Sequence, residues 1–113
     1  MPYESRTTAP ISRLQIARYA CAVGDFNPVH VDEAFATGRG LPSVIAHGPL
    51  TASLILDLIA DQVRADAIRK FDVRLAAPVF PGDELTVDFG DEGIIVRKAD
   101  GSVAAKVTLE VAE

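Results

Sequence analysis

Leu50-Thr-Ala-Ser-Leu-Ile-Leu-Asp-Leu-Ile-Ala-Asp-Gln-Val63 is the most hydrophobic run in this 113-residue chain. Polar residues interrupt the run at roughly four-residue spacing, so they share one narrow stripe of a helix. The stripe consists of Ser53, Asp57, Asp61 and Arg64. A helix with so thin a polar stripe must be almost completely surrounded. In a chain this small, we expect a curved sheet to surround it.

The C-terminal third of the chain supplies strands for such a sheet. Residues of strand-type composition, partly alternating, fill 68–77, 84–89, 94–98 and 103–111. Glycine-rich and Asp-Gly tips at 90–93 and 99–102 favour the positive φ of hairpin turns. Because such short loops join antiparallel neighbours, the sequence predicts an α+β domain with the long helix packed on one face of the sheet.

Another helix is expected ahead of this core. Ser12 followed by Gln15 fits a capping box, and apolar residues then recur at helical spacing. Gly24 ends this helix, because glycine adopts the left-handed conformation readily. A short helical piece is expected over 32–36 with Asp32 as its cap, followed by a loop at 37–43.

The turn after the first helix, Gly24-Asp-Phe-Asn-Pro-Val-His30, carries candidate chemistry. Asn27 is pushed out of the helical region by Pro28, so we expect Asp25 and His30 to project from irregular backbone and to converge. A carboxylate beside a neutral imidazole is suited to moving protons near neutral pH. The simpler interpretation is a structural turn, because Asp, Asn, Gly and Pro are the usual turn formers.

A second segment, Ile45-Ala-His-Gly-Pro-Leu-Thr51, strengthens the functional interpretation. It lies just ahead of the most apolar part of the chain and contains His47. By itself, a lone histidine after a turn, such as His30, is more often a satisfied hydrogen-bonding residue than a catalyst. Two such segments in one small chain favour a proton-transfer site.

Composition excludes several classes of partner. Apolar residues make up 49% and charged residues 24% of the chain, which is typical of a globular protein, and no segment is apolar for long enough to span a bilayer. The net charge of −5 argues against nucleic acid, and no membrane partner is expected.

The single cysteine, Cys21, cannot form an internal disulfide and is expected to be a small packed residue. The first ten residues lack the apolar core of a secretory signal, so we expect a cytoplasmic protein.

With these elements placed, the chain resembles the MaoC-like, or R-specific enoyl-CoA hydratase, family, which has the hot dog fold. The family signature is a small-residue helix ending in Gly-Asp-x-Asn-Pro-aliphatic-His, followed at a fixed interval by His-Gly before the central helix. The matching residues are Tyr19, Gly24, Asp25, Asn27, Pro28, Val29 and His30, then His47, Gly48, Leu50 and Thr51. The resemblance implies a single hot dog domain over 1–113, an antiparallel sheet wrapped around a long central helix. Residues 1–9 would be a short N-terminal segment, a truncated first strand.

The resemblance also implies an activity, the reversible hydration of trans-2-enoyl thioesters to (R)-3-hydroxyacyl thioesters, or the reverse dehydration. Asp25 and His30 would be the catalytic pair and would hold a water between them. One activates the water for attack on the β-carbon while the other protonates the α-carbon. Asp25 is favoured as the base, although the sequence leaves this division open. No cofactor and no metal is implied.

Three further residues are candidates for substrate binding. Gly48 is expected at or near the N-terminus of the central helix, where an unpaired N–H and the helix dipole would polarise the thioester carbonyl. Asn27 and His47 complete the set, although Asn27 suits fixing the turn and His47 suits bracing the loop. The acyl group would be carried by coenzyme A or an acyl-carrier protein. Because hot dog domains generally pair, we expect a homodimer, with a heteromer as the alternative.

Other functions remain open. A hot dog thioesterase would use an acidic residue of the central helix, such as Asp57 or Asp61, but their place on the polar stripe favours solvent exposure. A metal site would need the ligands Asp25, His30, Asp32 and His47, which have no recognised spacing. A scaffold or acyl-binding subunit of a heteromeric hydratase would usually lack one of the catalytic pair, and both are present.

Overall fold

A five-stranded antiparallel sheet forms the base of the computed structural model, which describes residues 3–91 and 93–112. The strands are β1 (Arg6–Thr7), β2 (Ile68–Leu75), β3 (Leu85–Gly90), β4 (Gly93–Lys98) and β5 (Val103–Val111). Their order across the sheet is β1-β3-β4-β5-β2, and each neighbouring pair is antiparallel. The predicted strands and their antiparallel arrangement are therefore confirmed, and the short β1 pairs with β3 at one edge.

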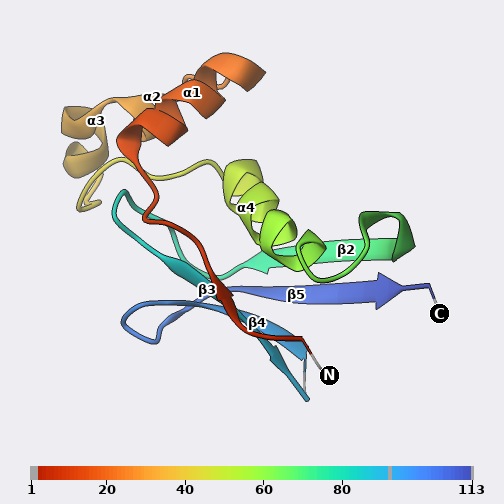
Figure 1. The fold of residues 1–113 in the computed structure, drawn as a ribbon. Coiled ribbons are helices and arrows are strands. Elements are labelled where there is room, and N and C mark those ends of the chain that lie inside the picture. The colour runs from red at the N-terminus through yellow and green to blue at the C-terminus, as the bar shows by residue number, and fades with distance from the viewer. Residues whose placement is uncertain (1–2, 92, 113) are drawn as a thin grey trace.

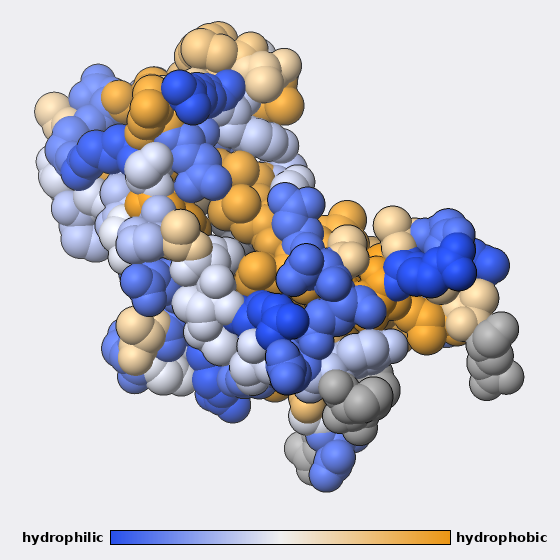
Figure 2. All heavy atoms as spheres, in the orientation of Figure 1, coloured by the Kyte–Doolittle hydropathy of each residue, from blue (hydrophilic) through white to orange (hydrophobic). Residues whose placement is uncertain are grey.

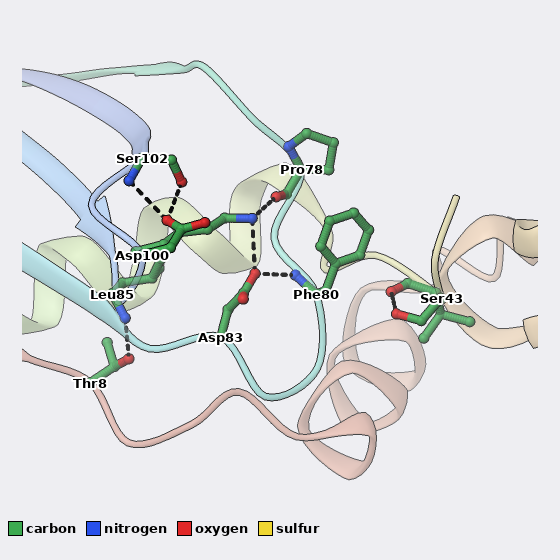
Figure 3. Close-up of polar contacts among 10 residues, drawn as sticks. Thr8, Ser43, Pro78, Phe80, Asp83, Leu85, Asp100 and Ser102 are labelled. Atoms are coloured by element: carbon green, nitrogen blue, oxygen red, sulfur yellow. Dashed lines mark hydrogen bonds and ion pairs between the residues drawn. The ribbon is translucent and has the colours of Figure 1, made fainter. Parts of the chain in front are cut away.

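Both predicted hairpins join neighbouring strands. The β3–β4 pairing reaches Gly90 and Gly93, while Glu92 at the tip lies outside the described residues. In the β4–β5 turn, the carboxylate of Asp100 accepts hydrogen bonds from the Ser102 hydroxyl at 2.6 Å and from the Ser102 N–H at 2.8 Å (Figure 3). These hydrogen bonds hold the pKa of Asp100 below its usual value, because they stabilise the ionised form.

The helices lie on one side of the sheet and beyond its end (Figure 1). They are α1 (Arg13–Val23), α2 (Pro28–Val31), α3 (Glu33–Gly38), α4 (Gly48–Ala60) and a short 3₁₀ helix, η1 (Ala65–Ala67). In Figure 1, α1, α2 and α3 gather at one end of the molecule, while α4 lies across the sheet. This arrangement brings the turn after α1 close to the first residues of α4.

Local sequence signals explain where the helices begin and end. The capping box at Ser12 is present, with the Gln15 N–H donating to Ser12 Oγ at 3.0 Å. Gly24 ends α1 with a φ of 73°, and Asp32 caps α3 by accepting from the Phe35 N–H. These three predictions are confirmed, because each depends on contacts within one helical turn.

Two local predictions are wrong. His30 does not lie on irregular backbone, because Pro28 starts a one-turn helix, α2, that carries it. Proline is well suited to the first turn of a helix, where its missing N–H costs nothing. Cys21 is exposed rather than packed, since it lies on the side of α1 that faces away from the rest of the chain.

The core lies between α4 and the sheet. The buried side chains of α4 are Leu50, Thr51, Ile55 and Ile59. Leu50, Ile55 and Ile59 join a core cluster that includes the sheet residues Leu85, Val87, Val96, Ala105 and Val107. The opposite side of α4 carries the exposed Ser53 and Asp57, as the polar stripe predicts.

The prediction that α4 is almost completely surrounded is wrong for a single chain. Leu54 and Leu58 on one flank of α4 and Leu56 on the other are only partly buried. One sheet of five strands covers one side of a helix and leaves its flank open. Figure 2 shows the resulting apolar surface, coloured orange, across the middle of the molecule. Among residues 3–91 and 93–112, none of the helices combines the length and apolar character that crossing a bilayer requires.

Candidate active site

The turn between α1 and α2 orients the carboxylate of Asp25. Asn27 caps α2, because its side-chain oxygen accepts from the Val29 N–H at 3.1 Å. The Asn27 N–H in turn donates to Asp25 Oδ1 at 3.3 Å. The asparagine therefore works within the turn, with its side chain committed to the backbone.

Asp25 and His30 approach each other as the sequence predicts. Asp25 Oδ2 lies 4.0 Å from His30 Nε2, and the side chains are 51% and 11% exposed. On the other side of the ring, His30 Nδ1 donates to the Ile45 carbonyl at 2.8 Å, since a carbonyl only accepts. This contact directs Nε2 toward the carboxylate and leaves it available to exchange a proton.

His47 lies beneath this pair. The His47 ring stacks on the His30 ring with centroids 3.8 Å apart. The Tyr19 ring packs against the His47 ring with centroids 4.9 Å apart. His47 Nε2 donates to the backbone carbonyl of Asp25 at 3.0 Å, and its Nδ1 is buried with no hydrogen-bond partner among the described residues. His47 thus contacts both members of the pair: it bonds to the backbone carbonyl of Asp25 and stacks on the ring of His30.

The same residues form the candidate metal cluster, with ligand atoms of Asp25, His30 and His47 all within 4.8 Å of one another. The rings of His30 and His47 are inclined by only 22°, so their nitrogen lone pairs point along nearly parallel planes and do not converge on one ion. Asp32, the fourth suggested ligand, caps α3 instead. The arrangement suits proton transfer better than coordination.

A pocket of about 330 Å³ opens beside His30. Its walls come from Ile45 and Ala46, from Gly48 and Thr51 in the first turn of α4, and from segment 75–79. Of the five candidate site residues, His30 and Gly48 line this pocket. Asp25 does not line the pocket, but its carboxylate lies 4.0 Å from His30 Nε2. The side chains of Asn27 and His47 hydrogen-bond instead to the backbone of Val29 and Asp25.

Gly48 is the first residue of α4, so the expected position at the helix N-terminus is confirmed. A Cβ added here would lie 3.0 Å from Leu75 Cδ1, which is closer than side chains normally pack. Glycine therefore lets Leu75 approach the start of α4 and keeps the Gly48 backbone accessible from the pocket. The helix dipole makes this end of α4 favourable for negative charge.

A polar brace at 78–83 supports the opposite wall and was not expected from the sequence (Figure 3). Lys98 Nζ donates to the Pro78 carbonyl at 2.6 Å and lies 3.0 Å from Asp83 Oδ2, which also accepts from the Phe80 N–H at 2.8 Å. The carbonyl of Val79 then accepts from the Ala46 N–H at 2.8 Å. The brace therefore connects β4 to the segment that precedes Gly48.

Sequence reasoning missed several residues that build the site. The Ile45 carbonyl, which orients His30, is a backbone group and leaves no residue-type signal. Lys98 lies far along the chain from Asp83, and only the turn residues 81–83 hinted that this loop has a defined shape. Leu75, which covers Gly48, resembles any other strand residue.

The whole chain, residues 1–113, matches the family model described as MaoC like domain. The chain is 32% identical over 87 residues to the (R)-specific enoyl-CoA hydratase of Aeromonas caviae, covering 75% of this chain and 65% of that protein. It is 33% identical over 95 residues to the fatty acid synthase subunit beta of Aspergillus oryzae, covering 81% of this chain and 5% of that protein. The chain thus spans less than two thirds of either relative.

A solved structure confirms the predicted hot dog fold. The unliganded R-hydratase PhaJ1 from Pseudomonas aeruginosa superposes with a TM-score of 0.78 at 25% sequence identity. The alignment covers 97% of this chain and 81% of that chain. The fold is therefore shared across nearly the whole of this chain.

Proposed function

The chain belongs to the MaoC-like domain family, and from that premise we propose that it hydrates trans-2-enoyl thioesters reversibly to (R)-3-hydroxyacyl thioesters. The observation that carries this proposal is the pocket that His30 and Gly48 line together, with Asp25 Oδ2 at 4.0 Å from His30 Nε2. Hydration of an enoyl thioester needs an acid and a base on one side and an oxyanion donor on the other. These groups are available around this one pocket.

The 4.0 Å gap between Asp25 and His30 suits a bridging water. A water oxygen at about 2.8 Å from both atoms would make two ordinary hydrogen bonds. In the proposed reaction, Asp25 takes one proton of this water while its oxygen forms a bond to the β-carbon. His30 in its protonated form gives the Nε2 proton to the α-carbon, and the proton on Asp25 then returns to His30 through solvent.

The Gly48 N–H is the proposed donor to the thioester carbonyl. As electrons move from the double bond toward the thioester, negative charge develops on the carbonyl oxygen, and the start of α4 stabilises it. A donor of this kind contributes about 2.7–4 kcal/mol to lowering the barrier. Asn27 and His47 serve in this proposal by holding Asp25 and the turn rather than by touching the acyl group.

The thioesterase alternative has less support. It would need Asp57 or Asp61 at the pocket, and neither residue lines it. Asp57 is exposed on α4. Asp61 is exposed at the C-cap of α4, where its carboxylate lies 3.5 Å from Arg6 Nε. We therefore place proton transfer to carbon, rather than hydrolysis, at this site.

We further propose that two copies of the chain pair through β2 and the apolar flank of α4. The outer side of β2 has no strand beside it among the described residues, and the apolar flank of α4 that carries Leu56 is only partly buried. A second copy would cover both features, and a related subunit is the alternative partner. The substrate would be an acyl group on coenzyme A or on an acyl-carrier protein, and no cofactor is needed.

The test is the loss of enoyl absorbance when the purified protein meets crotonyl-CoA and longer trans-2-enoyl-CoA thioesters. Asp25→Asn and His30→Asn should each lower kcat by about 10²–10⁴-fold, the contribution of a positioned acid or base. Asp32→Asn is the matched control. It changes a nearby carboxylate in the same way, and asparagine caps a helix as well as aspartate does, so activity should stay at the wild-type level.

Thioester hydrolysis that survives both Asp25→Asn and His30→Asn would overturn the proposal. Equal losses of activity in all three variants would mean that any substitution in this region disturbs its structure, and would not identify Asp25 and His30 as catalytic. Thermal unfolding of each variant separates these cases, because the proposed catalytic substitutions leave the fold intact.

A further inference from the structure

We propose that the hydroxyl of Thr51 is a second hydrogen-bond donor to the thioester carbonyl, acting beside the Gly48 N–H. This inference deepens the proposed function and rests on it for the identity of the ligand. It concerns a residue that belongs to the His-Gly segment and to which the sequence assigns no role. Three observations carry it: the burial of Thr51, its missing hydrogen bond, and its position on α4.

Thr51 is a buried polar residue, with 2% of its surface exposed. It nevertheless lines the pocket that His30 and Gly48 also line. Burying a hydroxyl costs free energy unless it finds a hydrogen-bond partner, so such a residue needs an explanation. The His47 ring is the other buried polar side chain among the described residues, and it bonds to Asp25.

The Thr51 hydroxyl has no partner among the described residues. Serine and threonine in helices usually bond back to a carbonyl in the preceding turn. Ser53 does so in the same helix, donating to the Pro49 carbonyl at 2.9 Å, and Thr37 does so in α3. For Thr51, only the backbone N–H bonds to the His47 carbonyl, at 3.0 Å.

The hydroxyl is also not sealed inside the protein. Among described residues that are not exposed, the one fully enclosed side-chain nitrogen or oxygen without a partner is His47 Nδ1. An unbonded Thr51 hydroxyl that is absent from this class must retain some accessible surface. Because Thr51 is only 2% exposed and lines the pocket, we assign this remaining surface to the pocket.

The position of Thr51 on α4 matches that of Gly48. Residues three apart in a helix lie on the same side of it, one turn from each other. The Gly48 N–H at the start of α4 and the Thr51 hydroxyl one turn later therefore face the same pocket. A carbonyl oxygen has two lone pairs and accepts two such donors. The ligand class is thus a thioester or another carbonyl compound whose oxygen gains negative charge during the reaction.

The test compares Thr51→Val, which keeps the branched shape without the hydroxyl, with Thr51→Ser, which keeps the hydroxyl. Thr51→Val should lower kcat for enoyl-CoA hydration by about 10²-fold, the lower end of the loss for removing one oxyanion donor. Its KM should change little, and Thr51→Ser should retain most of the activity. Thr51→Ala serves as a second hydroxyl-free variant if Thr51→Val does not fold.

A second measurement does not depend on turnover. The infrared carbonyl band of butyryl-CoA, labelled with ¹³C at the thioester, reports hydrogen bonding to that oxygen, and this saturated thioester cannot be hydrated. Binding to the wild-type protein should move the band to lower frequency, and Thr51→Val should reduce the displacement. Thr51→Ser should restore it.

The outcomes separate the two proposals. A band that moves with wild type and less with Thr51→Val, in a protein that hydrates no enoyl thioester, would support the Thr51 assignment and overturn the hydratase. A lower kcat with an unchanged band would overturn the assignment, because the hydroxyl would then act elsewhere. Equal kcat and equal band positions in wild type and Thr51→Val would also overturn it.

Discussion

His47 shows how one side chain can hold a site together without lining its pocket. Its ring lies between Tyr19 and His30, and its Nε2 donates to the Asp25 carbonyl at 3.0 Å. It also precedes Gly48 at the start of α4. One imidazole therefore connects α1, the Asp25 turn, α2 and the start of α4. In the proposed mechanism it is a positioning residue, since it exchanges no proton with the substrate.

Replacing His47 separates its ring from its hydrogen bond. His47→Phe keeps an aromatic ring between Tyr19 and His30 but removes the donor to Asp25. We expect the free energy of unfolding to fall by about 1 kcal/mol, the net value of one hydrogen bond. We expect kcat to fall by up to about 100-fold, because small displacements of a catalytic group are costly. Chemical denaturation and steady-state kinetics measure the two effects.

The pH dependence of kcat distinguishes positioning from catalysis at His47. If His47 only positions Asp25, the profile of His47→Phe keeps its shape at a lower level. Loss of one limb of the profile would show that His47 itself transfers a proton. His47→Gln, which retains a side-chain N–H donor, is the matched variant and should recover part of the activity.

At the scale of elements, the pocket wall depends on a loop that belongs to neither a helix nor a strand. Segment 78–83 is held by Lys98, which bonds to the Pro78 carbonyl, pairs with Asp83 and lies 4.9 Å from the centre of the Phe80 ring. The side chains of Lys98 and Asp83 are only 13% and 25% exposed, so this pair is less screened by water than an ordinary surface pair.

Lys98→Met removes the charge and keeps most of the aliphatic stem. We expect the free energy of unfolding to fall by about 1–3 kcal/mol, because Asp83 and the Pro78 carbonyl lose a partner in a half-buried position. We also expect KM to rise more than kcat falls, since the wall carrying Val79 loosens while Asp25 and His30 stay in place. Denaturation midpoints and steady-state kinetics check both.

Lys106→Met on β5 is the matched control for this prediction. Lys106 is exposed, so its replacement should change stability by no more than about 0.5 kcal/mol. If the two variants lose stability equally, the brace contributes nothing beyond a surface charge, and the support that we assign to it is wrong.

At the scale of the whole molecule, α4 is covered on one side only. Its flank residues are partly exposed, and β2 ends the sheet beside it, so apolar surface continues across the middle of the molecule (Figure 2). Large apolar patches on soluble chains usually mark interfaces. An edge strand of eight residues would also be prone to pairing with another strand.

Leu56→Glu tests the proposed pairing of two copies. A charge on the apolar flank of α4 would have to be buried at the interface, so the complex should dissociate. Sedimentation should give twice the mass of the chain for wild type and the mass of one chain for Leu56→Glu. Asp57→Asn, on the adjacent exposed stripe, should leave the wild-type mass unchanged. A wild-type protein that sediments as a single chain would contradict self-pairing and direct attention to a related subunit.

Sequence alone was sufficient where the cause is local. The Ser12 capping box, the left-handed Gly24 and the hairpin at 99–102 follow from interactions within a few residues, and each is found where expected. The approach of Asp25 to His30 belongs to the same class, because only four residues, one of them Pro28, lie between them. The short helix α2 was missed although its cause is local, since Pro28 also reads as the end of a helix.

Tertiary structure decided everything that joins distant parts of the chain. The Ile45 carbonyl that orients His30, the Leu75 side chain over Gly48 and the Lys98 brace at Asp83 all depend on where the sheet places its strands. The free Thr51 hydroxyl is another such feature, because a helical threonine normally bonds within its own helix. Local propensity constrains neighbours along the chain, whereas a pocket forms from segments that meet only after the core has packed.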